Sequence, residues 1–266
     1  MFPLHDNIPP RHTPFVNYIL LAITSAVFVV QLRSGDAIDS FIERWGMVPA
    51  RVLADDAGDR QLARQDVELV QTPSGVRQAL VTRRLESSAQ GDLLTLITCI
   101  FLHGGWLHFL GNMWFLHIFG DNVEDRFGHF LFLVLYILGG VLAAVAQIAV
   151  DPSSTVPTVG ASGAIAAVMG AYILLYPHAV VQTIIPLPLI FFTPFAVPAP
   201  IFLGVWFLIQ LYNGTIGQMA SSTGVAWWAH IGGFVAGLAA AAMLKLLGIA
   251  DPPVPREERH RDGILG

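Results

Sequence analysis

The chain has 266 residues, of which 54% are hydrophobic and only 12% are charged. Soluble domains usually carry about 25% charged residues, so this composition argues against a soluble globular protein and equally against a disordered one. The net charge of −5 comes from few residues that form no basic patch, and nucleic acid is therefore not an expected partner. The single cysteine, Cys99, excludes an intramolecular disulfide.

Charged residues are unevenly distributed along the chain. Eighteen of them lie in the 61 residues of segment 32–92, whereas Asp151 is the only one from Phe127 to Leu244. An aqueous domain with so few surface charges would aggregate, but segments of this kind suit the hydrocarbon core of a bilayer. The sequence therefore predicts an all-α polytopic membrane protein embedded in the lipid bilayer.

Six stretches are apolar enough to cross the membrane as helices, for which about 20 residues are needed. Segment 177–198 is also apolar, but its five prolines interrupt a continuous helix. We interpret it as an interfacial loop, with a seventh span as the alternative. In chain order, the six expected spans are residues 15–31, 93–119, 130–150, 160–176, 199–217 and 226–247.

These spans divide the chain into an N-terminal tail at 1–14, a membrane domain at 15–248 with a long polar loop at 32–92, and a C-terminal tail at 249–266. The first span lacks a strongly basic front, and no Ala-x-Ala cleavage site follows it. We therefore expect a retained helix in place of a signal peptide.

The positions of Lys and Arg predict the orientation in the membrane. Short segments on the N-terminal side of the membrane carry them, whereas the short loops 151–159 and 218–225 on the other side carry none. The positive-inside rule then places both termini in the cytoplasm and loop 32–92 outside.

Among the polar residues inside the apolar spans, where polar groups are costly and usually functional, four come from three distant spans. His108 and Asn112 are four residues apart and share one face of the second span. Ser162 lies at the start of the fourth span in a Gly-Ala-Ser-Gly sequence, and His230 lies near the start of the sixth. Because these three spans all begin on the outer side, the four residues should lie at similar depth.

This combination is typical of a serine nucleophile, which needs a base and donors for a developing oxyanion. We interpret Ser162 as the nucleophile, His230 as the general base and acid, and His108 and Asn112 as oxyanion donors. Taken singly, each residue has another explanation. Ser162 could be a helix cap and His230 a packed histidine, and His108 and Asn112 could form hydrogen bonds between helices. No Asp or Glu occurs in the fourth or sixth span, so we expect a Ser–His dyad.

Small residues at four-residue spacing let membrane helices approach closely, which a serine and a histidine on separate helices require. The two expected small faces consist of Ser162, Ala166 and Gly170 in the fourth span and of Ala229, Gly233, Gly237 and Ala241 in the sixth.

Other chemistries lack their sequence signatures. The chain has no His-Glu-x-x-His, Gly-x-Gly-Asp, Walker or dinucleotide motif and no pair of intramembrane aspartates, so no metal or cofactor is expected. Cys99 and His103 are spaced as an alternative thiol pair, but a buried reduced cysteine is the commoner case. His103 could also line the entrance or bind a lipid headgroup, and His117 is expected at the interface.

A small transporter would need paired intramembrane charges or broken helices in repeated halves, and neither is evident.

Three stretches of the sequence resemble the rhomboid family of intramembrane serine proteases. They are His-Gly-Gly-Trp-Leu-His-Phe-Leu-Gly-Asn at 103–112, Gly-Ala-Ser-Gly-Ala at 160–164 and Ala-His-Ile-Gly-Gly at 229–233. Gly-Asp-Asn-Val-Glu-Asp at 120–125 is also similar to the loop after the second helix in bacterial members. The resemblance covers about 93–245 and the first span.

The resemblance implies a six-transmembrane-helix rhomboid-like bundle in the plasma (inner) membrane, with a water-filled cavity open to the outer side. It implies an endopeptidase with Ser162 as nucleophile, His230 as base, and His108 and Asn112 stabilising the oxyanion. Its substrates would be single-span membrane proteins, cleaved within or next to their transmembrane segment. The alternative is a catalytically inactive rhomboid-like protein that binds or escorts membrane clients.

Two positions depart from the family pattern. Members often carry Tyr four residues after the serine, packed against the base, where this chain has Ala166. The Trp-Arg pair that is common in the first loop is not evident, and Trp45-Gly46 is the nearest candidate. The resemblance therefore leaves open which group positions His230.

Overall fold

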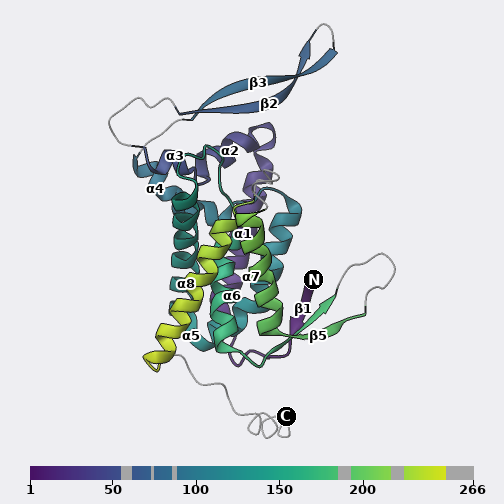
Figure 1. Ribbon diagram of the computed structural model, residues 1–266, viewed down its shortest axis with the longest axis vertical. Helices are drawn as coiled ribbons and strands as arrows, with labels where there is room; N and C mark the ends of the chain where they lie inside the picture. The colour runs from purple at the N-terminus through teal and green to yellow at the C-terminus, as the bar shows by residue number, and fades with distance from the viewer. Residues whose placement is uncertain (55–61, 73–74, 86–88, 185–192, 217–224, 250–266) are drawn as a thin grey trace, which may run out of the picture.

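The computed structural model contains an upright bundle of helices with a β-hairpin at one end and a small sheet near the other (Figure 1). It describes the chain except for residues 55–61, 73–74, 86–88, 185–192, 217–224 and 250–266. The C-terminal tail and most of the loop at 218–225 therefore lie outside the described residues. The main helices are α1 (Phe15–Arg33), α5 (Trp106–Val150), α6 (Ser162–Leu175), α7 (Ala199–Thr215) and α8 (Trp227–Leu246).

Five of the six expected spans correspond to helical segments with nearly the expected bounds. Among the described helices, α1, α5 and α8 are long and apolar enough to cross a membrane, while α6 and α7 have 14 and 17 residues. Helix α5 has 45 residues, but its backbone leaves the helical region at Gly128, where φ is 73°. This positive φ suits glycine and divides α5 into two segments, which match the end of the second expected span and the whole of the third.

The prediction of one continuous second span over residues 93–119 was wrong. Helix α4 (Ala89–Thr98) and the short helix η2 (Cys99–Phe101) end before α5 begins. Gly105 precedes α5 with a φ of 151°, a conformation that few other residues adopt. The backbone N–H of His103 also leaves the helical pattern and donates to Gln31 Oε1 in α1. The chain thus makes a sharp turn just before the segment that carries His108.

The expectation of an all-α fold needs a second correction, because the described part of a mostly helical chain also contains two sheets. Strands β1 (Phe2–Asp6), β4 (Val180–Ile184) and β5 (Phe195–Pro198) form an antiparallel sheet in the order β1-β4-β5. Among the described prolines of segment 177–198, Pro177 lies in the turn after α6, and Pro198 ends a strand at the sheet edge, where a missing N–H is tolerated. Strand β1 belongs to the segment that the sequence presented as an N-terminal tail.

The described part of the long polar loop lies at one end of the bundle. It contains η1 (Gly35–Ala37), α2 (Ile38–Trp45), α3 (Pro49–Val52) and the antiparallel hairpin of β2 (Leu62–Thr72) and β3 (Gly75–Leu85).

The buried Arg51 holds the helical part of this loop together. Its guanidinium donates to the carbonyl oxygens of Glu43 and Gly46 and lies 2.9 Å from a carboxylate oxygen of Asp92. Burial lowers the pKa of Arg51, and the charges of Asp92 and Glu43 oppose this shift. Thr98 in α4 donates to the carbonyl oxygen of Trp45, so the loop is tied to the helix that leads into the bundle.

Helix α6 occupies the centre of the bundle, packed against α5 and α8. A Cβ at Gly237 would lie only 1.8 Å from the carbonyl oxygen of Ala167, and one at Gly233 only 2.1 Å from that of Gly163. On the α6 side, a Cβ at Gly170 would lie 2.0 Å from the carbonyl oxygen of Phe234. The backbones of α6 and α8 are therefore in direct contact, which confirms the expected close approach of the two small faces.

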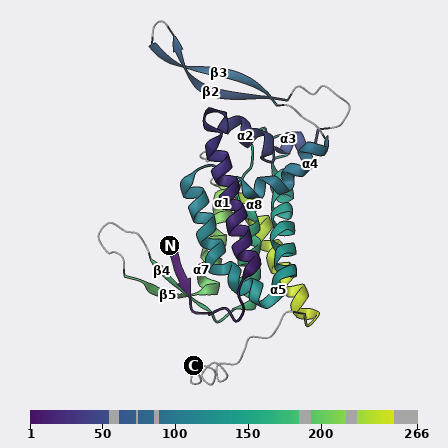
Figure 2. The ribbon, with the colours of Figure 1, turned by 180° about the vertical axis from the view of Figure 1, so that it is seen from behind.

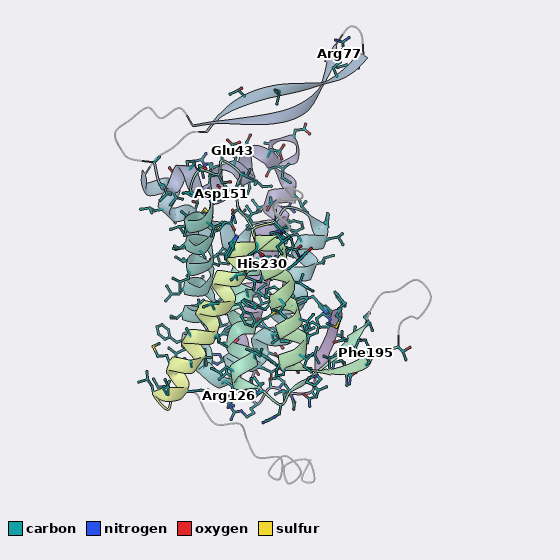
Figure 3. All side chains as sticks on the ribbon, viewed as in Figure 1. Glu43, Arg77, Arg126, Asp151, Phe195 and His230 are labelled. Carbon is teal, nitrogen blue, oxygen red and sulfur yellow. The ribbon has the colours of Figure 1, made fainter. Side chains whose placement is uncertain are left out.

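The two ends of the bundle differ in the segments that they carry. Figure 3 places Arg126 at one end and Glu43, Asp151 and Arg77 at the other. Figure 2 shows α1 in front of the bundle, on the face turned away from the viewer of Figure 1. Loop 32–92 and the turn at Asp151 thus share one end, as the alternation of spans predicts.

A polar network ties the opposite end together. The Asp6 carboxylate accepts hydrogen bonds from the Tyr172 hydroxyl at 2.5 Å and the Asn122 amide at 2.8 Å. Burial raises the pKa of Asp6 against the lowering effect of its hydrogen bonds. The Glu124 carboxylate accepts from the backbone N–H groups of Val16 and Asn17, at the first turn of α1. Strand β1 and helix α1 are therefore both fixed to the helices of the core.

Candidate active site

A cavity of about 510 Å³ lies between α5, α6, α7 and α8. Its lining includes Thr158, which pairs with Met47 of loop 32–92, so this loop lies near the cavity. Its lining includes all four residues that the sequence analysis singled out: Ser162, His230, His108 and Asn112. Figure 3 places His230 in the half of the bundle nearer to Asp151 than to Arg126. The structure thus brings together side chains from three segments that are far apart in the sequence.

Ser162 and His230 are in hydrogen-bond contact. Ser162 is the first residue of α6 and His230 lies in the first turn of α8, with 2.8 Å between Ser162 Oγ and His230 Nε2. The backbone contact between Gly163 and Gly233 lies next to this pair, and it brings the two helices close enough for the side chains to meet. A nucleophile and base at this separation satisfy the first geometric requirement for a serine hydrolase.

His108 lies close to Ser162 and lines the same cavity. A Cβ at Gly160 would lie 2.7 Å from both Cε1 and Nε2 of His108 and 3.5 Å from Ser162 Oγ, and Gly160 has a φ of 130°. Only glycine fits this position without strain. The backbone N–H of Gly104 donates to His108 Nδ1 at 3.3 Å, so in the neutral ring the proton resides on Nε2. His108 therefore presents an N–H donor toward Ser162.

Asn112 follows His108 by one helical turn and supplies a second donor. The residue is 7% exposed, and its Nδ2 has no hydrogen-bond partner among the described residues. Buried polar atoms are rarely left without a partner, and such exceptions often mark functional groups. Both α5 donors thus line the cavity that contains Ser162 Oγ.

The surroundings of His230 contain three residues that the sequence analysis missed. Gln210 Oε1 in α7 lies 2.8 Å from His230 Nδ1, and the ring of Trp206 lies 5.8 Å from the imidazole, centroid to centroid. Trp227 meets the imidazole edge-on at 6.1 Å. Ala166, where an aromatic was sought, is fully buried in α6. The aromatic contacts of His230 therefore come from α7 and α8, and the only sequence signal for Gln210 is a strongly polar residue inside an apolar span.

The other candidate residues do not line the cavity beside Ser162 and His230 in the expected roles. His103 is fully buried and absent from the cavity lining, but its ring packs edge-on against His108, at 5.2 Å between centroids, as well as against Phe28 and Phe109. Cys99 lines the cavity wall, but the helix ends at Phe101, so Cys99 and His103 lack the helical i,i+4 relation that a thiol pair would need. His117 packs near Trp114. Within the described ranges, no group of three or more His, Cys, Asp or Glu could hold a metal ion.

The chain is similar to members of a known protein family. The family model of the rhomboid domain matches residues 90–246, more than half of the chain. The chain is 34% identical over 87 residues to the putative rhomboid protease YdcA of Bacillus subtilis. This match covers 33% of this chain and 43% of the relative. The chain is also 39% identical over 88 residues to the rhomboid protease GluP of the same organism, covering 33% of this chain and 16% of the relative.

A longer match joins the chain to a rhomboid-like protein from the mitochondria of Arabidopsis thaliana, with 34% identity over 166 residues, 56% of this chain and 46% of the relative. The chain spans less than half the length of each of these curated relatives. The bundle of apolar helices and the family match identify the chain as a multi-pass membrane protein. It belongs to the rhomboid family, several of whose members are named as proteases.

Proposed function

We propose that the chain is an intramembrane serine endopeptidase that cleaves membrane-anchored proteins within or next to their transmembrane segment. The observation that carries this proposal is the 2.8 Å contact between Ser162 Oγ and His230 Nε2 inside the cavity. Serine is a weak nucleophile at neutral pH, and an imidazole at this distance can accept its proton as the hydroxyl attacks.

The remaining groups suit the charge that such a reaction develops. Ser162 Oγ adds to the scissile carbonyl carbon while its proton passes to His230 Nε2. The carbonyl oxygen becomes an oxyanion, which the N–H of His108 and the amide of Asn112 stabilise. When the intermediate collapses, His230 returns the proton to the leaving amine. Water then hydrolyses the acyl-enzyme through the same base, and the serine is regenerated.

The position of the cavity favours membrane-anchored substrates. In the proposed topology, the protein lies in the plasma membrane and crosses it six times, with both termini in the cytoplasm. The six crossings are α1, the two segments of α5, α6, α7 and α8. The cavity then opens on the outer side. A single-span substrate would reach it from the bilayer with the outer end of its helix unwound, because a peptide bond inside an intact helix is not accessible to the serine.

An inactive rhomboid-like protein that binds membrane clients is the second candidate function, and the first experiment distinguishes the two. We would co-express the chain with a panel of tagged single-span membrane proteins and compare wild type with Ser162→Ala. The proposal expects a shortened product of at least one substrate with wild type and none with Ser162→Ala at equal expression. Equal processing by both proteins, or stable co-purification of uncleaved clients with both, would contradict it.

A further inference from the structure

Gln210 is a buried polar residue in an otherwise apolar helix. It lies in α7, is 5% exposed, and both polar atoms of its side chain make hydrogen bonds. A polar side chain in a membrane-spanning segment is costly, so a fully paired amide at the cavity wall calls for an explanation beyond packing.

The two hydrogen bonds fix which way the amide points. Gln210 Nε2 donates to the backbone carbonyl oxygen of Trp206 at 2.9 Å, one turn earlier in the same helix. A carbonyl oxygen can only accept, so a flipped amide would place two oxygens against each other. Oε1 must therefore be the atom that faces His230 Nδ1, at 2.8 Å.

This orientation determines the position of the imidazole proton. Because Gln210 Oε1 can only accept, His230 Nδ1 must donate, and the neutral ring then has no proton on Nε2. The lone pair of Nε2 is directed at Ser162 Oγ. We propose that Gln210 is a positioning residue that holds His230 in the tautomer able to act as a base. This inference rests on the proposed function.

His108, the other histidine near Ser162, shows how the partner of Nδ1 sets the tautomer of the ring. The backbone N–H of Gly104 faces Nδ1 of His108, which places that proton on Nε2 and makes the ring a donor. The two histidines beside Ser162 therefore hold opposite tautomers, each set by the partner of its Nδ1. In soluble serine proteases a buried aspartate orients the base. An amide orients the imidazole in the same way and avoids the cost of a charge inside the membrane.

The first test measures the tautomer directly in the wild-type chain. Nitrogen NMR of the purified protein, labelled at the histidine ring nitrogens and compared with His230→Ala to assign the signals, distinguishes protonated from unprotonated ring nitrogens. At a pH where the ring is neutral, we expect His230 to be protonated at Nδ1 and unprotonated at Nε2. The opposite pattern would overturn the proposal, whatever the behaviour of any variant.

The second test measures the reactivity of Ser162 with a fluorophosphonate, which needs no known substrate. Gln210→Met keeps the length of the side chain but removes the acceptor, and should slow labelling about tenfold, the equivalent of one hydrogen bond. Gln210→Glu keeps an acceptor toward Nδ1 and should retain more of the rate than Gln210→Met. The matched control is Gln147→Met, at a residue of α5 that is 7% exposed and does not line the cavity.

The outcomes separate this inference from the proposed function. If wild type is labelled at Ser162 and Gln210→Met is labelled equally fast, the positioning role is wrong while the dyad stands. Equal slowing in Gln210→Met, Gln210→Glu and Gln147→Met would assign the loss to packing and also contradict the role. If wild type is not labelled at Ser162, the proposed function fails, whereas the tautomer measurement still decides whether Gln210 orients the ring.

Discussion

The two histidines at the cavity, His230 and His108, differ in how they face Ser162. Ser162 Oγ contacts Nε2 of His230, while Nε2 of His108 and Ser162 Oγ would both lie within 3.5 Å of a Cβ at Gly160. In the proposed tautomers, His230 accepts a hydrogen bond from Ser162 and His108 donates toward the same region. This division suits a reaction in which a proton leaves the serine as negative charge develops on the substrate oxygen.

The oxyanion assignment predicts graded effects at the two α5 residues. Loss of one oxyanion donor costs about 10²–10³ in turnover in soluble serine proteases. Asn112→Ala should therefore leave weak residual cleavage, because the N–H of His108 remains, and Asn112→Ala combined with His108→Ala should lower it further. Turnover of both variants is measured in reconstituted vesicles. Asn112→Ala activity within twofold of wild type would assign this residue to packing.

Sequence alone identified Ser162, His230, His108 and Asn112 as candidates because each is a polar group in an apolar span, and the alternation of spans put them at one depth. It did not identify Gln210, although Gln210 has the same signal. Which face of a helix meets His230 depends on the rotation of α7 about its axis, and an apolar span without a polar face carries no information about that rotation.

At the scale of the helices, direct backbone contact between α6 and α8 sets the geometry of the site. This predicts opposite results for two substitutions of glycine by alanine. Gly237→Ala should lower the thermal unfolding midpoint and the activity, because its Cβ would lie 1.8 Å from the carbonyl oxygen of Ala167. Gly204→Ala in α7, with nothing within 4 Å of its Cβ, should be neutral or stabilising because alanine favours helices. Equal midpoints for the two variants would contradict the close contact.

The second element-scale prediction concerns the attachment of β1 to the bundle. Asp6→Ala leaves the hydroxyl of Tyr172 and the amide of Asn122 without their acceptor, and both residues are fully buried. An orphaned buried donor costs about 1–3 kcal/mol, so the unfolding midpoint in detergent should fall. His5→Ala, at an exposed neighbour in the same strand, is the control and should change little.

The fall in the unfolding midpoint caused by Asp6→Ala should also depend on pH. Burial raises the pKa of Asp6, so the folded chain binds this proton more tightly than the unfolded chain. The stabilising contribution of the carboxyl is then fullest below about pH 4 and declines as pH rises through the raised pKa. The difference in midpoint between wild type and Asp6→Ala should shrink from acidic to neutral pH. A difference in midpoint that grows from acidic to neutral pH would show that folding lowers the pKa of Asp6.

Helix positions were predictable where hydropathy is continuous, as in α1, α7 and α8. The errors arose where backbone conformation overrides hydropathy. Gly105 and Gly128 adopt positive φ values that interrupt helices inside apolar stretches, and the three-stranded sheet pairs segments more than 170 residues apart, Phe2 with Ile184 among them. Local pattern does not specify such long-range pairing, which depends on the bundle that brings the strands together.

At the scale of the whole molecule, the cavity lies near loop 32–92, and the positive-inside rule predicts that this end of the bundle faces the outside of the cell. We would test this with single cysteines in a Cys99→Ala background, at the exposed Ser40 in α2 and at Leu247 beyond α8. An impermeant thiol reagent should label Ser40→Cys in intact cells and Leu247→Cys only after permeabilisation. The reverse pattern would invert the orientation and place the cavity on the cytoplasmic side.

The central claim is that Ser162 and His230 act as one nucleophilic unit. Its most direct test is to treat the purified chain with a fluorophosphonate and locate the adduct by peptide mass mapping. We predict an adduct on Ser162 in wild type, formed by attack of Oγ on phosphorus with loss of fluoride. Ser162→Ala, His230→Ala and the double variant should be about equally unreactive, since the losses of a coupled pair do not add. An adduct at another residue, or rapid labelling of Ser162 in His230→Ala, would contradict the dyad.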